Sequence, residues 1–259
     1  MVRPSQGFST YKEPDQFVTG FMMSNNQDLA FHSDQADAFE KSLVLSSDSV
    51  LTGLTSGAMV VTRNGEIPVE WLETSDEVLT RDQGFVKVLW LNRVKLERDS
   101  FRERPDYAPV TIPAGRVDGE FPTHDVTVSP DQLVMLRSPL AERDYWSTEV
   151  LVPASSLGSQ AEVDDMRWYS RAIYTQVMLP THEAIIVDGL WCGTIFTGSL
   201  AKSKDMDRSP LAQQMKDPRM MSTRPILDAE EARVLVSEID EFNAKHKKTM
   251  SQDTIRASA

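Results

Sequence analysis

Cysteine is almost missing from this sequence, which has one, Cys192, among 259 residues. One thiol cannot form a disulfide within the chain, and it cannot build a cysteine-based zinc cluster. The residues around it, 190–196, form an apolar run. A lone cysteine in such a run is among the most buried of residue types. We therefore expect Cys192 to be an inert, buried thiol.

Signals for metals and cofactors are missing too. The sequence has four histidines: His32, His124, His182 and His246. They stand too far apart to predict a metal triad. The glycines at 53, 57 and 65 do not have the spacing of a P-loop or of a dinucleotide-binding loop. We expect no metal and no cofactor.

Basic clusters and long apolar runs are scarce as well. The formal net charge is −12, and nucleic-acid binding needs Lys and Arg gathered against the phosphates, so we expect no nucleic-acid partner. No apolar run reaches the roughly 18 residues of a membrane span. Residues 1–17 have no apolar core behind their basic residue and do not predict a secretory signal. A cytoplasmic location is the default expectation, while signal-independent export or assembly into a particle stays open.

Composition divides the chain into three parts. Residues 1–49 are polar with scattered aromatic residues, and we expect an arm or linker with a short helix near 34–45. Residues 50–200 form the main domain. Residues 201–259 begin as a polar, Met-rich linker. A capping box at Asp228 and Glu231 then predicts an amphipathic helix from about 228 to 246, followed by a loose tail.

The middle part consists of short apolar runs separated by turn signals. Expected strands cover 58–62, 77–80, 85–91, 109–115, 125–129, 132–136, 149–154, 173–179 and 183–189. β-branched residues dominate these runs and helical periodicity is absent. Asn64-Gly65 and the turn at 81–84 predict hairpins. We therefore expect a mainly β domain of closed architecture.

An ordered set of segments in this domain resembles bacterial Hint domains, the fold of inteins and hedgehog autoprocessing domains. Within 53–91 the matching positions are Thr55, Gly57, Asn64-Gly65, Pro68-Val69-Glu70, Leu72, Asp76, Val78-Leu79-Thr80 and Trp90. Residues 124–136 look like the family's Ser-Pro-x-His segment, 149–157 like its Val-Pro-Ala step and 182–198 like its closing strand. The resemblance implies a compact, horseshoe-shaped fold of short strands and hairpins.

The resemblance also implies a chemistry. A Hint domain begins with Cys, Ser or Thr, whose side chain attacks the preceding carbonyl and shifts the acyl group onto sulfur or oxygen. A Thr/Ser-x-x-His segment supplies a His that protonates the departing nitrogen and a hydroxyl that orients the peptide. The nucleophile position falls on Gly53, which has no side chain. The hydroxyl position falls on Ser129 and the His position on Gln132, which cannot donate a proton near neutral pH.

Other residues provide alternatives. With the register shifted by one, Thr52 would attack the carbonyl of Leu51, and His124 would serve as the acid. The simpler interpretation makes Thr52 and His124 polar residues at strand ends. His182 matches a recurring His of the closing strand, and we expect it to hydrogen-bond across the fold.

The loss at Gly53 and Gln132 together favours a catalytically degenerate Hint domain. We expect it to be a structural or protein-interaction module, for example in a bacterial or phage-like assembly. Residues 1–49 and the helix at 228–246 are the expected means of binding a partner or of self-assembly. The alternative is a self-processing domain that cleaves its backbone near Thr52/Gly53 by an N-to-O acyl shift.

Overall fold

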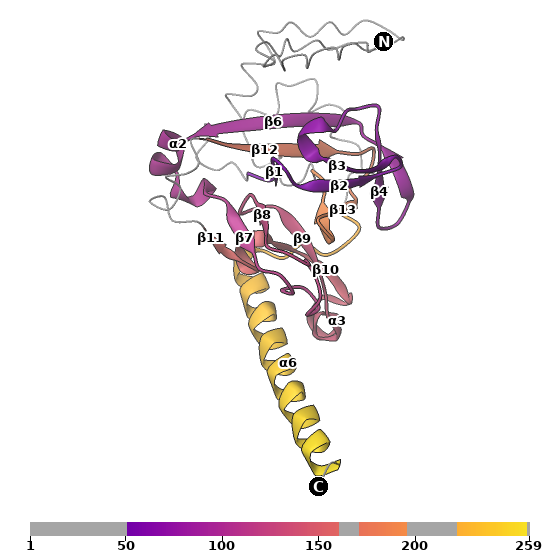
Figure 1. Ribbon diagram of the computed structural model, residues 1–259, viewed down its shortest axis with the longest axis vertical. Helices are drawn as coiled ribbons and strands as arrows, with labels where there is room; N and C mark the ends of the chain where they lie inside the picture. Colours follow the sequence, from indigo (N-terminus) through magenta and orange to yellow (C-terminus); the bar gives the residue numbers. More distant parts are fainter. Residues whose placement is uncertain (1–50, 161–170, 196–221, 258–259) are drawn as a thin grey trace, which may run out of the picture.

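The computed structural model describes residues 51–160, 171–195 and 222–257, and these fold mainly as two antiparallel β-sheets. The first sheet contains, in spatial order, β11 (Ser159–Gln160), β7 (Val110–Ile112), β8 (Val126–Val128), β1 (Leu54–Thr55), β12 (Arg171–Met178) and β6 (Trp90–Glu97). The second contains β10 (Glu149–Pro153), β9 (Leu133–Arg137), β14 (Leu190–Gly193), β13 (Ala184–Val187), β2 (Met59–Thr62), β4 (Glu77–Thr80) and β5 (Gly84–Lys87), with β3 (Gly65–Pro68) beside β2. Figure 1 shows β6 and β12 side by side as the longest strands.

Helices are few in the described part of the chain. They are α2 (Arg98–Glu103), α3 (Pro139–Tyr145), α6 (Ala229–Ala257) and the short 3-10 helices η1 (Val69–Trp71), η2 (Pro105–Tyr107) and η3 (Ala154–Ser156). The sequence analysis overlooked α3, although its start carries a signal: Ser138 precedes Pro139, and the Ser138 hydroxyl accepts a hydrogen bond from the Leu140 amide at 3.2 Å. The mainly β fold itself is confirmed.

The expected strand at 85–91 is wrong in one respect, because this run is divided between the two sheets. β5 ends at Lys87, and β6 begins at Trp90. Between them, the Leu89 amide donates to the Met178 carbonyl at 2.9 Å, at the end of β12 in the first sheet. A continuous apolar pattern marks burial but does not tell one sheet from another.

Two of the hydrophobic clusters in the described part of the chain position the site. The larger lies between the sheets, and the C-terminal segment contributes Leu227, just before α6, and Ala232, Leu235 and Val236 from α6 itself. The smaller is separate and includes Leu51, Val94, Leu96, Phe101, Tyr107, Ala108 and Tyr174. Leu51 closes this smaller core from the N-terminal side of β1, so the domain includes residues that come just before its first strand.

The C-terminal helix starts as predicted and ends later. The Asp228 carboxylate accepts from the amides of Glu230 and Glu231, and the Glu231 carboxylate accepts from the Asp228 amide at 3.0 Å. The helix continues to Ala257 instead of ending near His246, so the expected loose tail is wrong. No Gly or Pro follows Asp228, so no local signal ends the helix earlier. The expected arm at 1–49 and its helix lie outside the described residues.

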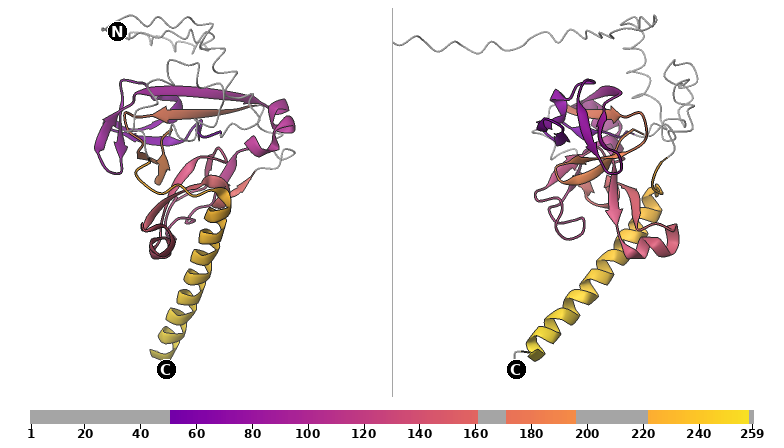
Figure 2. Two further views of the ribbon diagram at one scale, coloured as in Figure 1. Left: turned by 180° about the vertical axis from the view of Figure 1, so that it is seen from behind. Right: turned by 90° about the vertical axis from the view of Figure 1, so that its right-hand side faces the viewer.

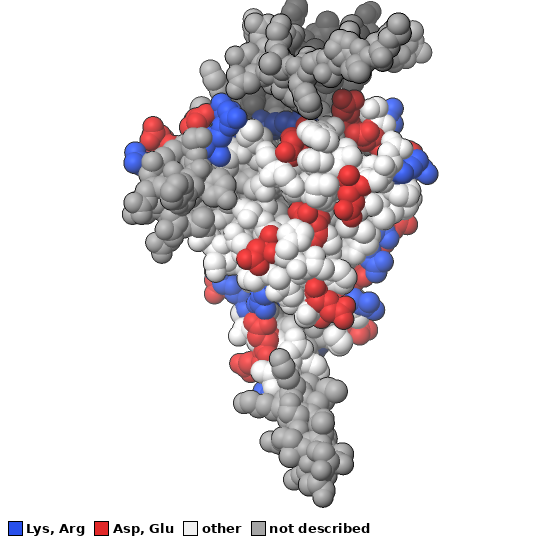
Figure 3. All heavy atoms as spheres, in the orientation of Figure 1, with Lys and Arg blue, Asp and Glu red and all other residues white. Residues whose placement is uncertain are grey.

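Figures 1 and 2 show that α6 projects from the domain on the side away from β6. On the face shown in Figure 3, acidic side chains spread across the middle and basic ones gather toward the margins. Among the described residues, no helix is long and apolar enough to cross a membrane.

Candidate functional site

The segment from Leu51 to Thr55 enters the centre of the first sheet. Leu54 pairs with Val128 of β8 on one side and with Thr175 of β12 on the other. The Gly53 carbonyl accepts a hydrogen bond from the Ser129 amide at 3.0 Å. The fold therefore brings Gly53 and Ser129, two positions singled out from the sequence, into direct contact.

Position 53 has no room for a side chain. Gly53 is buried and has a φ of +156°, a backbone conformation that L-residues rarely adopt. A Cβ built there would lie 2.8 Å from the Cβ of Tyr174 and 3.3 Å from the Thr175 carbonyl oxygen. β12 thus occupies the space that a nucleophilic side chain would need.

The peptide group before Gly53 is held by side chains that the sequence analysis missed. Gln176 donates from Nε2 to the Thr52 carbonyl at 2.9 Å, and Asn92 donates from Nδ2 to Gln176 Oε1 at 3.0 Å. Polar residues within strands β6 and β12 were the available signal. The polar side chains of Asn92 and Gln176 interrupt runs that are otherwise rich in apolar residues.

Asp131 binds the backbone of Leu51, the residue before Thr52. Its Oδ2 accepts a hydrogen bond from the Leu51 amide at 3.1 Å. Burial raises the pKa of the Asp131 carboxyl above its usual value, and this hydrogen bond from Leu51 opposes the shift. Asp131 lies between Ser129 and Gln132 in the family-like segment, so the same turn contacts the chain on both sides of Thr52.

Gln132, which the sequence analysis assigned to the family's His position, turns its amide toward the second sheet. Its Nε2 donates to the Leu133 carbonyl at 3.0 Å and to the Gly193 carbonyl at 2.8 Å. The Ser129 hydroxyl is fully buried and has no hydrogen-bond partner among the described residues. Gln132 therefore fulfils a structural role, while Ser129 keeps a buried hydroxyl beside Gly53.

His182 lies close to Gln132 in the fold. Its exposed fraction is 1%, and burial lowers the pKa of its imidazole to about 4, against an opposing hydrogen bond with the backbone of Thr194. A Cβ at Gly193 would stand 3.6 Å from His182 Nε2. Gln132 and His182 therefore border the same glycine. A ring with this pKa is neutral at pH 7 and is a poor proton donor there.

The remaining candidates lie elsewhere. His124 stands before β8, at the opposite end of that strand from Val128 and Gly53, and its ring lies 3.6 Å from the Asp188 carboxylate. The structure does not bring His124 to Thr52. Cys192 is buried, and burial raises its thiol pKa to about 12, so the neutral thiol is unreactive near pH 7. The described residues contain no group of three His, Cys, Asp or Glu side chains able to hold a metal ion.

A family model for the Hint domain matches residues 52–199. The chain belongs to the Hint domain family. The match begins at Thr52, next to Gly53, and spans the two sheets up to the last described residues of the domain. The resemblance drawn from the residues is thereby confirmed, and the Hint domain ends well before the helix α6.

Two solved intein structures are similar to this Hint domain. A splice-inactive variant of the AceL NrdHF class 3 split intein is 12% identical, covers 56% of this chain and 98% of its own, and has a TM-score of 0.35. The gp41-1 intein is also 12% identical, covers 56% of this chain and 99% of its own, and has a TM-score of 0.33. No curated protein matches the chain.

Proposed function

We propose that this is a non-catalytic Hint domain that serves as a structural or protein-interaction module. The observation that carries the proposal is the contact between positions 53 and 174. The nucleophile of a Hint domain must have a side chain at position 53, and a Cβ there would come within 2.8 Å of Tyr174 Cβ. Two Cβ atoms that are not bonded do not approach so closely. The absence of a nucleophile therefore involves the packing of β12 around position 53 as well as the glycine itself.

Gln132 supports the same conclusion. Its amide is bound to two carbonyl oxygens and has no acidic proton to give. The neighbouring His182 is neutral at pH 7 because burial lowers its pKa. The nucleophile and the general acid of a Hint site are therefore both missing from this domain, while the hydroxyl of Ser129 is present.

The helix α6 supports an interaction role. It has 29 residues, or about 44 Å at 1.5 Å per residue. Leu235 and Val236 pack into the core, whereas residues 240–245 are exposed. A helix that extends beyond its supporting domain is a common means of binding a partner helix or groove. Residues 1–49 are the second proposed binding element.

The test compares oligomeric state and captured partners among three proteins: the full chain, a chain lacking 1–49 and a chain lacking 246–259. Size-exclusion chromatography with light scattering reports the first property, and affinity purification from the source cells reports the second. We expect at least one deletion to change assembly or partner binding. If both deleted chains match the full chain in mass and in partners, the interaction proposal is wrong.

One observation favours a second function, self-processing near Thr52/Gly53. Gln176 donates to the Thr52 carbonyl, which is the position of a donor that stabilises an oxyanion on that carbonyl. In one route the Thr52 hydroxyl attacks the Leu51 carbonyl, the Leu51–Thr52 amide bond breaks as the ester forms, and added hydroxylamine then cleaves the ester. In the other, on which the Gln176 contact bears directly, an added thiol attacks the Thr52 carbonyl and displaces the protonated amine of Gly53. Intact-mass analysis with added thiol or hydroxylamine tests this function. Fragments ending at Leu51 or Thr52 support it, and a single full-length mass excludes it.

A further inference from the structure

The C-terminal segment binds the Hint domain as an added strand. The family match ends at residue 199, yet Ile226 forms a parallel bridge with Leu151 of β10, at the edge of the second sheet. The Leu151 amide donates to the Pro225 carbonyl, and the Leu227 amide donates to the Leu151 carbonyl, each at 2.9 Å. This is the main-chain pattern by which a peptide adds to an exposed sheet edge.

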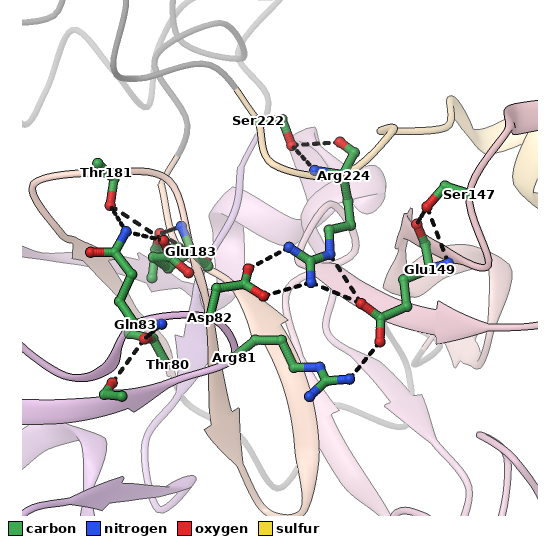
Figure 4. Close-up of polar contacts among 12 residues, drawn as sticks. Thr80, Arg81, Asp82, Gln83, Ser147, Glu149, Thr181, Glu183, Ser222 and Arg224 are labelled. Carbon is green, nitrogen blue, oxygen red and sulfur yellow. Dashed lines mark hydrogen bonds and ion pairs between the residues drawn. The ribbon is translucent and has the colours of Figure 1, made fainter.

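A charged site beside this edge recognises one side chain. Figure 4 shows the Arg224 guanidinium between the carboxylates of Asp82 and Glu149. Arg224 makes two hydrogen bonds to Asp82 and donates to Glu149 Oε2 from Nη2 at 2.8 Å and from Nε at 3.1 Å. The Arg224 side chain is 16% exposed, so the pair is largely shielded from water. Both carboxylates come from the Hint domain itself, on the β4–β5 turn and on β10.

The electrostatics show that this site fits a cation. The hydrogen bond from Arg224 holds the pKa of the Asp82 carboxyl below its usual value. Glu149 also accepts from Arg81 at 2.7 Å, and the two arginines lower the Glu149 pKa against the effect of burial. Without Arg224, the Hint domain would present two partly buried carboxylates, of which only Glu149 has an arginine partner, Arg81. A guanidinium completes the charge balance and matches the planar geometry.

The helix start completes the contact surface. After the strand, Leu227 enters the core, Asp228 caps α6, and the helix packs against α3, β10 and η3. At the rim, Arg143 pairs with Glu238 at 2.8 Å, and Arg116 forms a two-pronged pair with Asp240. One surface of the domain therefore binds the C-terminal segment through the strand contact, the Arg224 guanidinium, the buried apolar residues and the ion pairs at the rim.

We propose that this surface is a peptide-binding site of the Hint domain. Its ligand is an extended segment that carries an arginine and, three residues later, a leucine. An amphipathic helix with an acidic cap follows the leucine. Residues 222–245 of this chain are the segment that fills the site. The binding is independent of the covalent connection through residues 196–221. A break in the backbone there therefore leaves the helix attached to the domain. The inference does not depend on whether the domain cleaves itself.

The experiment uses the full chain with a recognition sequence for a specific protease inserted between residues 205 and 206. The protein is folded, labelled with a fluorophore at its C-terminus, cut and passed over a size-exclusion column at 10 µM. We expect the labelled piece to elute with the Hint domain. Dilution of the cut protein, followed by fluorescence anisotropy, then gives the Kd. Separate elution of the piece at 10 µM overturns the proposal.

Three variants test the recognition of Arg224. Arg224→Ala leaves two carboxylates unpaired, and we expect it to raise the Kd at least about tenfold, because truncating one partner of a shielded pair weakens binding strongly. Asp82→Asn removes the charge and replaces one of the two oxygens that accept from Arg224 by an amide donor, so it should act in the same direction. Arg233→Ala is the matched control, since Arg233 belongs to the same C-terminal piece and is exposed on α6. If Arg224→Ala and Arg233→Ala give the same Kd, the charged site does not recognise this ligand.

Discussion

The Tyr174 hydroxyl donates a hydrogen bond to the Tyr107 carbonyl oxygen at 2.8 Å, in the smaller core behind Gly53. This bond, together with the pairing of β12 with β6, fixes the strand whose Cβ limits position 53. The glycine at position 53 and the buried tyrosine are therefore parts of one arrangement. A side chain at position 53 cannot be accommodated by a simple rotation of Tyr174, because its Cβ belongs to the strand.

Gly53→Ala should lower the free energy of unfolding by about 2–4 kcal/mol, from the strained φ and from overpacking. Gly57→Ala is the matched control. Gly57 also has a positive φ, of +88°, but a Cβ there meets nothing within 4 Å. Urea denaturation of both variants separates the backbone term from the clash. Equal losses in the two variants would show that Tyr174 does not exclude a side chain.

Restoring both chemical groups should not restore cleavage. We expect Gly53→Cys with Gln132→His to give one full-length mass after purification, because the thiol has no space beside Tyr174 and the histidine replaces an amide that bonds two carbonyls. Intact-mass analysis checks this outcome. A new fragment ending at Thr52 would mean that β12 yields and that the site has lost only its two side chains.

Tyr174→Phe should cost about 1–2 kcal/mol of stability, since it leaves the Tyr107 carbonyl oxygen without its buried donor. Tyr145→Phe provides the comparison, because the Tyr145 hydroxyl has no hydrogen bond within the described ranges. Thermal or urea unfolding followed by circular dichroism gives both values. The interpretation fails if the two substitutions have the same effect.

Acid should destabilise the domain through His182. Its folded-state pKa of about 4 lies below the ordinary value of 6.5, so the unfolded state binds a proton more readily in this interval. The contribution is fully present above pH 6.5 and is lost as the pH falls from 6.5 to about 4, amounting to about 3 kcal/mol.

The check is the pH dependence of unfolding for His182→Gln and for His124→Gln. The first substitution should flatten the profile between pH 6.5 and 4. The second replaces a ring that is exposed beside the Asp188 carboxylate, and it serves as the comparison for losing a histidine elsewhere in the fold. A profile that keeps its slope without His182 would assign the acid sensitivity to other groups.

The sequence was sufficient for the β class, for most strands and for the capped start of α6, because each depends on local patterns or turn chemistry. It could not reveal the Gln176 contact with Thr52 or the Asp131 contact with Leu51. The first joins residues separated by 124 positions in the sequence, and the second joins residues separated by 80. The sequence assigned the family's nucleophile position to Gly53 by alignment alone. The close approach of Tyr174 is a tertiary property, and no spacing in the sequence encodes it.

The Arg224 site was missed for a similar reason. Arg224, Asp82 and Glu149 each resemble ordinary surface charges, and only folding brings the three together. The sequence analysis ended α6 too early, near residue 246, although no helix breaker follows that residue.

The two-residue strand β1 determines how the molecule responds to mechanical load. It lies in the interior of the first sheet, bonded to both β8 and β12, and the amide of Leu51, shortly before it, donates to Asp131. Tension applied through residues 1–49 therefore acts on the middle of the fold, where several hydrogen bonds must break together. Tension applied at the other end acts first on the rim pairs and the apolar contacts of α6, and then on the edge bridge and the Arg224 pairs, which break one after another. Pulling experiments should therefore detach the C-terminal helix at a lower force than the force that opens the first sheet.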